Sequence, residues 1–274
     1  MTLTAYKTVQ KLHPVFTGVA LLFLGMFCGC ASRRGDLAVT GTEAPFPRHL
    51  WIEYLPEPDY AAHPERGTGR PTPMFSAWSD QRMHSDLQQM ADAGMEVILI
   101  RMSPEEFAQR ATFHRVMHFA SLASSRQLAV AVYLTSKEAL HLEYHNLQHW
   151  LAQYSYPSAP GIARYSGLPF VLIGGNITVD KLPQNEDTLQ LLLCGQDCPV
   201  PPQASTAEGV AVINGICWIR AGASPRILHS SLRSAQRAGA QIIIVSSWNN
   251  HAEGTYVQPN SGDGSAYVEA LRKL

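Results

Sequence analysis

The sequence lacks the features that would indicate a nucleic-acid binder, a metalloprotein or a repeat protein. Charged residues make up only 16% of the 274 residues, and the formal net charge of −1 shows no excess of either sign. We therefore expect no nucleic-acid partner. Of the three cysteines that follow position 30, Cys194 and Cys198 form one closely spaced pair without a matching second pair. We expect no metal site and no cofactor, and the sequence leaves open whether these two cysteines form a disulfide.

The chain also lacks an apolar run long enough to cross a membrane. Val15–Phe27 spans about thirteen residues, whereas a membrane-spanning helix needs roughly twenty. Lys7 and Lys11 precede this run, which is the usual layout of a secretory signal.

The end of this segment resembles the lipobox of bacterial lipoproteins, in its Gly-Cys-Ala-Ser sequence at positions 29–32. The resemblance implies that residues 1–29 are a signal peptide and that Cys30 becomes the acylated first residue. Residues 30–48 are small, polar and Pro-containing, as expected of a tether. Acyl chains on one cysteine anchor a domain firmly. By analogy, Ala31 favours the outer membrane, so we expect an exported protein that is lipid-anchored to the cell envelope.

Patterns typical of strands and helices alternate from residue 49 to residue 274. This alternation predicts an α/β domain with a parallel sheet, and its length suits a (β/α)8 TIM barrel, incomplete or irregular because only six or seven strands are evident. The expected strands are Leu50–Leu55, Val97–Ile100, Leu128–Leu134, Pro169–Ile173, Leu189–Leu193, Val210–Ile219 and Gln241–Val245. The expected helices are Asp80–Ala93, Pro104–Arg126, Ser136–Tyr154, Pro225–Ala238 and Gly264–Leu274.

A polar, aromatic and acidic cluster follows the last expected strand. The stretch 246–259 reads Ser-Ser-Trp-Asn-Asn-His-Ala-Glu-Gly-Thr-Tyr-Val-Gln-Pro. In barrels of alternating strands and helices, chemistry collects on the loops at the carboxyl ends of the strands. The sequence therefore predicts a functional site here.

Residues 247–255 resemble the Ser-Trp-Asn-Glu-Trp-His-Glu-Gly-Thr signature of glycoside hydrolase family 99, a family of endo-acting α-mannosidases and α-mannanases. Weaker likenesses at 78–94, at 165–171 and in the closing helix extend the resemblance over most of residues 50–274. It implies a TIM barrel that hydrolyses α-mannosidic bonds with retention, using two glutamates on this loop. The second maps onto Glu253, as general acid/base; the first maps onto Asn250.

The asparagine matters because an amide cannot accept a proton as a carboxylate does. Glycoside cleavage normally needs two carboxyl groups flanking the scissile bond. If Glu253 is the acid, the second group must come from elsewhere. The candidates near predicted strand ends are Glu53, Glu105 and Glu138, and His251 could serve as a base because its ordinary pKa is near neutrality.

Other residues near the expected strand ends are candidate substrate contacts. Trp248 suits stacking on a sugar ring but equally suits the core. Asn249 and Asn250 can bond either sugar hydroxyls or loop backbone. His251 is a further candidate, and so are Glu53 and Tyr54, which end the first strand.

These observations favour a membrane-anchored glycoside hydrolase acting on mannose-containing or related polysaccharide, with Glu253 as general acid/base. The alternative is a carbohydrate-binding envelope lipoprotein without catalysis that lost the second glutamate. The sugar, its linkage and the oligomeric state are not determined by the sequence.

Overall fold

The computed structural model describes residues 49–56, 78–153, 155–165, 167–179, 190–193, 216–221, 224–250 and 255–273. All of them belong to the unit Gly35–Leu274. The expected signal peptide, Cys30 and the tether lie outside the described residues, so the lipoprotein prediction stays a prediction. Cys194, Cys198, His251 and Glu253 also lie outside them.

Seven parallel strands form the central sheet, in the order β6-β5-β3-β2-β1-β8-β7. The short β4 pairs antiparallel with β5 at one edge, and β9 and β10 form a separate hairpin. The strands are β1 His49–Tyr54, β2 Val97–Met102, β3 Ala129–Leu142, β4 Arg164–Tyr165, β5 Leu168–Val179, β6 Gln190–Leu193, β7 Ile216–Arg220, β8 Ile242–Ser246, β9 Asn249–Asn250 and β10 Thr255–Tyr256.

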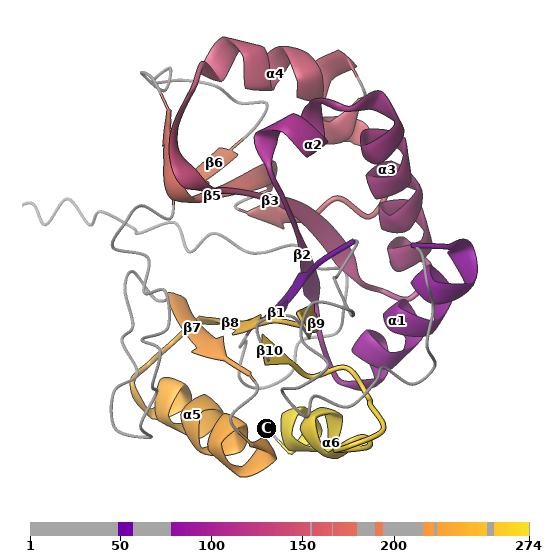
Figure 1. The fold of residues 1–274 in the computed structure, drawn as a ribbon, viewed down its shortest axis with the longest axis vertical. Coiled ribbons are helices and arrows are strands. Elements are labelled where there is room, and N and C mark those ends of the chain that lie inside the picture. The colour runs from indigo at the N-terminus through magenta and orange to yellow at the C-terminus, as the bar shows by residue number, and fades with distance from the viewer. Residues whose placement is uncertain are drawn as a thin grey trace, which may run out of the picture. The chain divides into compact units, whose positions relative to one another are not determined.

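Helices lie on the outer side of the curled sheet (Figure 1). None of those within the described residues is long and apolar enough to cross a membrane. They are α1 Asp80–Asp92, α2 Pro104–Ala108, α3 Arg110–Ser124, α4 Tyr144–Gln153, the 3-10 turn η2 Tyr156–Ser158, α5 Pro225–Arg237 and α6 Ala266–Arg272.

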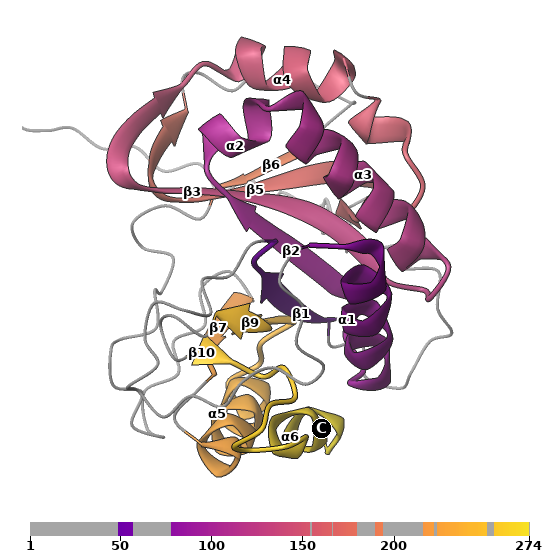
Figure 2. The same cartoon turned by 45° about the vertical axis from the view of Figure 1, so that its right-hand side comes forward.

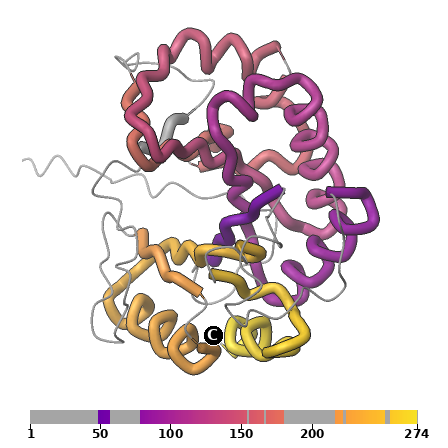
Figure 3. The backbone as a smooth tube through the Cα atoms, viewed as in Figure 1, coloured from indigo at the N-terminus to yellow at the C-terminus, as the bar shows by residue number. Residues whose placement is uncertain are grey.

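The sheet curls into an arc, which makes the domain an incomplete TIM-like barrel and confirms the expected fold class. The indigo β1 lies between β2 and the late strand β8, so the two halves of the chain meet in mid-sheet (Figure 3). Among the described residues β6 and β7 do not pair, and the chain between them, 194–215, is not described.

Strand alternation divides the core into two layers. Ile52 and Tyr54 point outward into the larger layer, which packs against the helices. Trp51 points into the arc, where it stacks on Phe170 with ring centroids 5.3 Å apart. Successive residues of a strand face opposite sides, so each strand supplies both layers. Figure 2 shows α1 and α3 lying side by side along the outer face.

The helix expected at Ser136–Tyr154 is wrong in its first half. Strand β3 continues to Leu142, and α4 begins only at Tyr144. Residues 136–140 read Ser-Lys-Glu-Ala-Leu, which favours a helix, but pairing with the extended β5, for example Leu140 with Ile177, overrides that local preference.

The helix expected at Pro104–Arg126 is two helices. Gln109 is extended (φ −76°, ψ 120°), which ends α2 and begins α3. The break lets Phe107 and Phe113, one from each helix, pack edge to face at 5.3 Å within the core.

A buried carboxylate ties helix α1 to the ends of β1 and β8. Asp86 Oδ2 accepts hydrogen bonds from the Tyr54 hydroxyl (2.8 Å) and from Arg82 Nε (3.3 Å). Its Oδ1 accepts from Gln258 Nε2 (2.9 Å) and from Trp248 Nε1 (3.4 Å). Burial raises the pKa of Asp86 above its ordinary value, while the Arg82 charge and the hydrogen bonds from Tyr54, Trp248 and Arg82 oppose the rise. The network joins three segments that are far apart in the sequence.

We predict that Asp86→Ala lowers the free energy of unfolding by about 3 to 5 kcal/mol, because it leaves the buried Arg82 guanidinium without its carboxylate. Urea denaturation followed by circular dichroism measures the loss. Asp92→Ala is the matched control in the same helix, since the exposed Asp92 carboxylate accepts a hydrogen bond from the Gln88 side-chain amide and takes no part in the buried network. It should change stability by less than about 0.5 kcal/mol. Equal effects of the two substitutions would contradict this account of the network.

Candidate active site at the carboxyl ends of the strands

Polar and aromatic side chains face the inside of the arc where its strands end. Alternation places them there: Leu99 is an inner-layer residue, so Arg101, two positions later on β2, shares its face. The same argument applies along β1, β3 and β7. We call the resulting group the strand-end cluster, and it consists of Glu53, Arg101, Tyr133, Trp218 and Arg220.

An ion pair lies at the centre of the strand-end cluster. Arg101 Nη1 is 3.0 Å from Glu53 Oε1. The Glu53 side chain is 3% exposed and that of Arg101 is 26% exposed. Burying a carboxylate without a partner is costly, so Arg101 explains how an acid can lie inside the arc. The pair thus presents a fixed carboxylate beside a partly exposed cation.

Tyr133 lies next to this pair. Burial and the Glu53 charge raise the pKa of Tyr133 to about 12, with Arg101 opposing the rise. The phenol therefore keeps its proton throughout the physiological range and can act as a hydrogen-bond donor. The Tyr133 ring meets that of Trp218 at 5.5 Å, which connects β3 to β7 across the inside of the arc.

Gly174 on the neighbouring strand β5 makes room for Tyr133. A Cβ atom at Gly174 would lie 2.8 Å from the Tyr133 hydroxyl oxygen and 2.9 Å from a ring carbon. Both distances are too short for real contacts. A glycine is therefore required if the phenol is to keep this position.

Arg220 brings a second cation to the inner face. It ends β7, in register with Ser246 of β8. Cys217 and Ile219 belong to the outer layer, whereas Ile216 and Trp218 pack against the inner one. Alternation therefore places Arg220 on the inner side, where it is half-buried.

The loop after β8 is fastened to the end of β1. Trp248 N donates to Glu53 O (2.6 Å). The Asn249 amide bonds both backbone groups of Leu55: its Nδ2 donates to the carbonyl at 2.7 Å and its Oδ1 accepts from the N–H at 2.9 Å. Asn249 thus satisfies loop backbone, which is one of its two expected roles.

After this loop, β9 and β10 form an antiparallel hairpin. Asn250 pairs with Thr255, and its backbone N–H donates to Ser247 Oγ at 3.0 Å. Ser247 Oγ in turn donates to the Thr255 carbonyl at 2.7 Å. The four-residue connection 251–254, which holds His251 and Glu253, therefore starts and ends at the strand-end side of the barrel, but its own residues are not described.

Tyr54 and Trp248, both expected as candidate sugar contacts, lie in the outer layer. Each is 0% exposed, and each donates to Asp86. Tyr54 also stacks on Phe119 at 5.2 Å. This placement favours a structural role for both rings over the expected substrate contact, because neither ring has a surface to offer a sugar.

The structure separates the three expected partners of Glu253. Glu105 is exposed on helix α2, and Glu138 is exposed where β3 pairs irregularly with β5. Only Glu53 of the three faces the inside of the arc. Four cluster members, Arg101, Tyr133, Trp218 and Arg220, were missed by the sequence reasoning. The signal available was alternation, since each stands on the same face as an inner-layer neighbour two positions before it.

The described part of the chain offers neither a cluster of metal-binding side chains nor an activated cysteine. No three His, Cys, Asp or Glu residues of that part come together in a group suited to a metal ion. Cys217 is buried and unpaired with another cysteine, and burial raises the pKa of its thiol to about 11. Such a thiol carries little thiolate at neutral pH.

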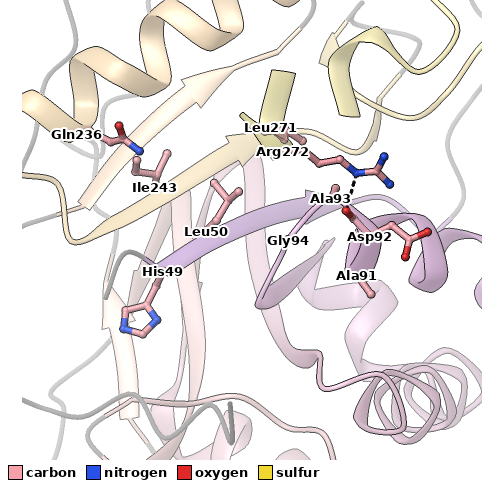
Figure 4. Close-up of a pocket in the computed structure, with 10 residues that line it drawn as sticks. All are labelled: His49, Leu50, Ala91, Asp92, Ala93, Gly94, Gln236, Ile243, Leu271 and Arg272. Carbon is pink, nitrogen blue, oxygen red and sulfur yellow. Dashed lines mark hydrogen bonds between the residues drawn. The ribbon is translucent and has the colours of Figure 1, made fainter. Parts of the chain in front are cut away.

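A cavity of about 490 Å³ lies at the opposite end of the strands (Figure 4). His49 and Leu50, which begin β1, line it together with the end of α1 and with Arg272, whose Nε donates to the Asp92 carbonyl at 2.7 Å. The cavity contacts no member of the strand-end cluster. In TIM barrels the amino-terminal end of the strands serves stability rather than chemistry, so the cluster is the better candidate site.

Comparison with solved structures shows the same fold. The endo-α-mannosidase of glycoside hydrolase family 99 from Bacteroides thetaiotaomicron, in complex with BIS-TRIS-propane, aligns with a TM-score of 0.57 at 12% identity, over 82% of this chain and 94% of that one. A second structure of that enzyme gives 0.54 at 11% identity, over 82% and 95%. A glycoside hydrolase-like protein gives 0.54 at 10%, over 85% and 95%.

These likenesses extend over nearly the full length of the matched structures, and at such low identity they establish the fold alone. The expected structural resemblance to family 99 is confirmed at that level. No protein-family model and no curated protein sequence matches the chain.

We predict that Gly174→Ala costs about 1 to 3 kcal/mol in the free energy of unfolding, because the new methyl group forces Tyr133 to move. The measurement is a double-mutant cycle in urea with Tyr133→Ala. Removing the phenol should abolish most of the cost. An unchanged cost in the Tyr133→Ala background would mean that Gly174 is needed for another reason.

Proposed function

We propose that this protein is a glycoside hydrolase acting on mannose-containing or related polysaccharide, with Glu253 as general acid/base and Glu53 as the second carboxylate. The observation that carries the proposal is the buried Glu53 on the inner face at the end of β1. The likeness of the fold to an endo-α-mannosidase supports the reaction class. The Ser247–Thr255 motif supports the assignment of Glu253.

Glu53 can supply the second carboxylate, which is missing at position 250 because Asn250 stands where the family has a glutamate. Its ion pair with Arg101 holds the carboxylate in place and balances its charge. Glycosidases place two carboxyl groups about 5 to 5.5 Å apart for retention and about 6.5 to 9.5 Å apart for inversion. Glu253 would protonate the leaving oxygen from the hairpin connection, while Glu53 would act as base or nucleophile from the carboxyl end of β1, the strand beside β8.

Other residues at the strand ends would bind the saccharide substrate. Tyr133 would donate a hydrogen bond to a sugar oxygen, because its raised pKa keeps the proton on the phenol. Trp218, which lies against Tyr133, offers an aromatic surface within the arc. Asn250, which ends β9, and His251, the next residue along the chain, remain proposed contacts.

We predict that the purified protein releases reducing sugar from a mannan or a related polysaccharide, and that Glu253→Gln and Glu53→Gln each lower kcat by about 100-fold or more, because each removes one of two required carboxyls. Reducing-end assay with product chromatography measures this. Glu138→Gln is the matched control, being exposed and off the inner face, and should retain full activity.

The alternative is a binding protein that lost catalysis, and Asn250 in the position of a family glutamate favours it. In that case the native protein binds the polysaccharide without cleaving it, and Glu253→Gln changes only affinity. Cleavage that survives both Glu53→Gln and Glu253→Gln would refute the assigned carboxylates. Absence of any binding to saccharides would refute both functions.

We also propose that the domain works at the cell envelope, anchored through lipid on Cys30 after removal of residues 1–29. This rests on the lipobox-like sequence and on the short apolar run before it. An anchored hydrolase would meet polysaccharide at the cell surface without diffusing away.

We predict that Cys30→Ala moves the full-length protein, expressed in a double-membraned bacterium, from the membrane fraction to the soluble envelope fraction, because the acyl chains are lost. Immunoblots of fractionated cells, with incorporation of labelled palmitate, measure the change. Cys217→Ala is the control and should leave both readouts unchanged. Labelling that persists without Cys30 would overturn the proposed anchor.

A further inference from the structure

We infer that Asp86 and Gln258 are positioning residues for the proposed reaction. They hold the hairpin that carries Glu253 at a fixed place relative to Glu53. The inference rests on the proposed function, which assigns the reacting carboxyl groups to these two glutamates. Asp86 is 1% exposed and Gln258 is 2% exposed, so neither side chain has a surface on which to bind a saccharide. Both must therefore act through the segments that they hold.

Both ends of the hairpin converge on a single oxygen atom. We call residues 248–250 and 255–258 the hairpin stem. Trp248, which precedes β9, donates from Nε1 to Asp86 Oδ1 at 3.4 Å, and Gln258, which follows β10, donates from Nε2 to the same atom at 2.9 Å. The Gln258 backbone N–H also donates to the Trp248 carbonyl at 2.8 Å. The stem is thus closed on itself and fastened to helix α1 by its two end residues.

The same carboxylate is also bonded to the end of β1. Its other oxygen, Oδ2, accepts a hydrogen bond from the Tyr54 hydroxyl at 2.8 Å, and Tyr54 directly follows Glu53 in the strand. Trp248 adds a second connection, because its backbone N–H donates to the Glu53 carbonyl at 2.6 Å. Asp86 therefore links the strand end that carries Glu53 to the hairpin that carries Glu253.

The spacing of the two carboxyl groups makes this link relevant to the reaction. Retention needs about 5 to 5.5 Å between them and inversion about 6.5 to 9.5 Å, so a shift of roughly 1 Å can take a pair out of its working range. A misplacement of that size can lower a rate by about 100-fold. Glu253 lies in the connection 251–254, and both ends of that connection are fixed by the stem.

We predict that Gln258→Met lowers kcat on an α-mannan by at least about tenfold, because the stem loses the shorter of its two side-chain bonds to Asp86. Methionine fills a similar volume but cannot donate a hydrogen bond. KM should change by less than about twofold, since the loss affects the alignment of the reacting groups rather than the binding of the saccharide. Initial rates of reducing-sugar release at a series of α-mannan concentrations measure both constants.

Hydrogen exchange followed by mass spectrometry tests the cause. In Gln258→Met the stem amides should exchange at least about tenfold faster than in the native protein, whereas those of β2 and β3 should not change. Tyr156→Phe is the matched control, because it removes a buried hydroxyl that donates to the Phe170 carbonyl at 2.9 Å, on a strand three positions from β1 in the sheet. It should lower stability and leave kcat and stem exchange unchanged.

The native protein decides the question if Gln258→Met does not fold. The backbone N–H groups of Val257 and Gln258 both donate to the Trp248 carbonyl, so the amides of a fixed stem should exchange as slowly as those of β8. Slow exchange at these positions supports the inference, and exchange as fast as that of an exposed loop overturns it.

The outcomes separate the inference from the proposed function. A lower kcat with unchanged KM and faster stem exchange in Gln258→Met supports the inference. An unchanged kcat, an effect on KM alone, or a loss of kcat without faster stem exchange overturns it and leaves the proposed glycoside hydrolase intact. A native protein that cleaves no mannose-containing polysaccharide overturns the inference together with the proposed function.

Discussion

The Arg82–Asp86 ion pair is the constraint on which the arrangement of the site depends. It is 1 to 2% exposed, in a layer made mostly of apolar side chains, and such a pair is tolerated only when the remaining polar atoms are satisfied. Arg82 Nη1 donates to the Pro56 carbonyl (3.0 Å) and Nη2 to that of Leu55 (3.3 Å). The turn after β1 is thereby fixed to helix α1, and Asn249 bonds the same Leu55 from the β8 loop. Helix α1 and the loop after β8 are therefore both bonded to the turn at the end of β1.

Two ion pairs of the same chemistry lie on opposite faces of β1, and their surroundings give them different roles. Arg82–Asp86 is enclosed by helix α1 and the outer layer, so it can only hold parts of the fold together. Arg101–Glu53 faces the inside of the arc, and Arg101 is partly exposed. Perturbed and charged groups mark function only where they can be reached. The outer pair positions the strand end from which the inner pair acts.

Much of the fold follows from local sequence patterns, because apolar runs alternate with amphipathic helical segments. Such a chain can bury the apolar faces of its strands and helices against each other by forming a parallel sheet covered by helices. The strand Gln241–Val245 and the helix Asp80–Ala93 were predicted within a residue or two. The tail of β3 could not be predicted, since Lys137, Glu138 and Ala139 favour a helix and only the distant strand β5 makes them extended.

The side-chain placements that the sequence analysis did not anticipate at the candidate site have a single physical cause, the two-residue period of a strand. Glu53 and Tyr54 were both assigned to the substrate because both stand at the end of β1, yet neighbours on a strand must face opposite sides. One of them therefore belongs to the outer core layer. It is Tyr54, whose hydroxyl donates a hydrogen bond to the buried Asp86 carboxylate. The same rule, applied to Leu99 and Trp218, would have located Arg101 and Arg220 from the sequence. What the sequence could not supply is the distance between those strands, because the register that brings β7 beside β8 and β1 is set by packing of the whole sheet.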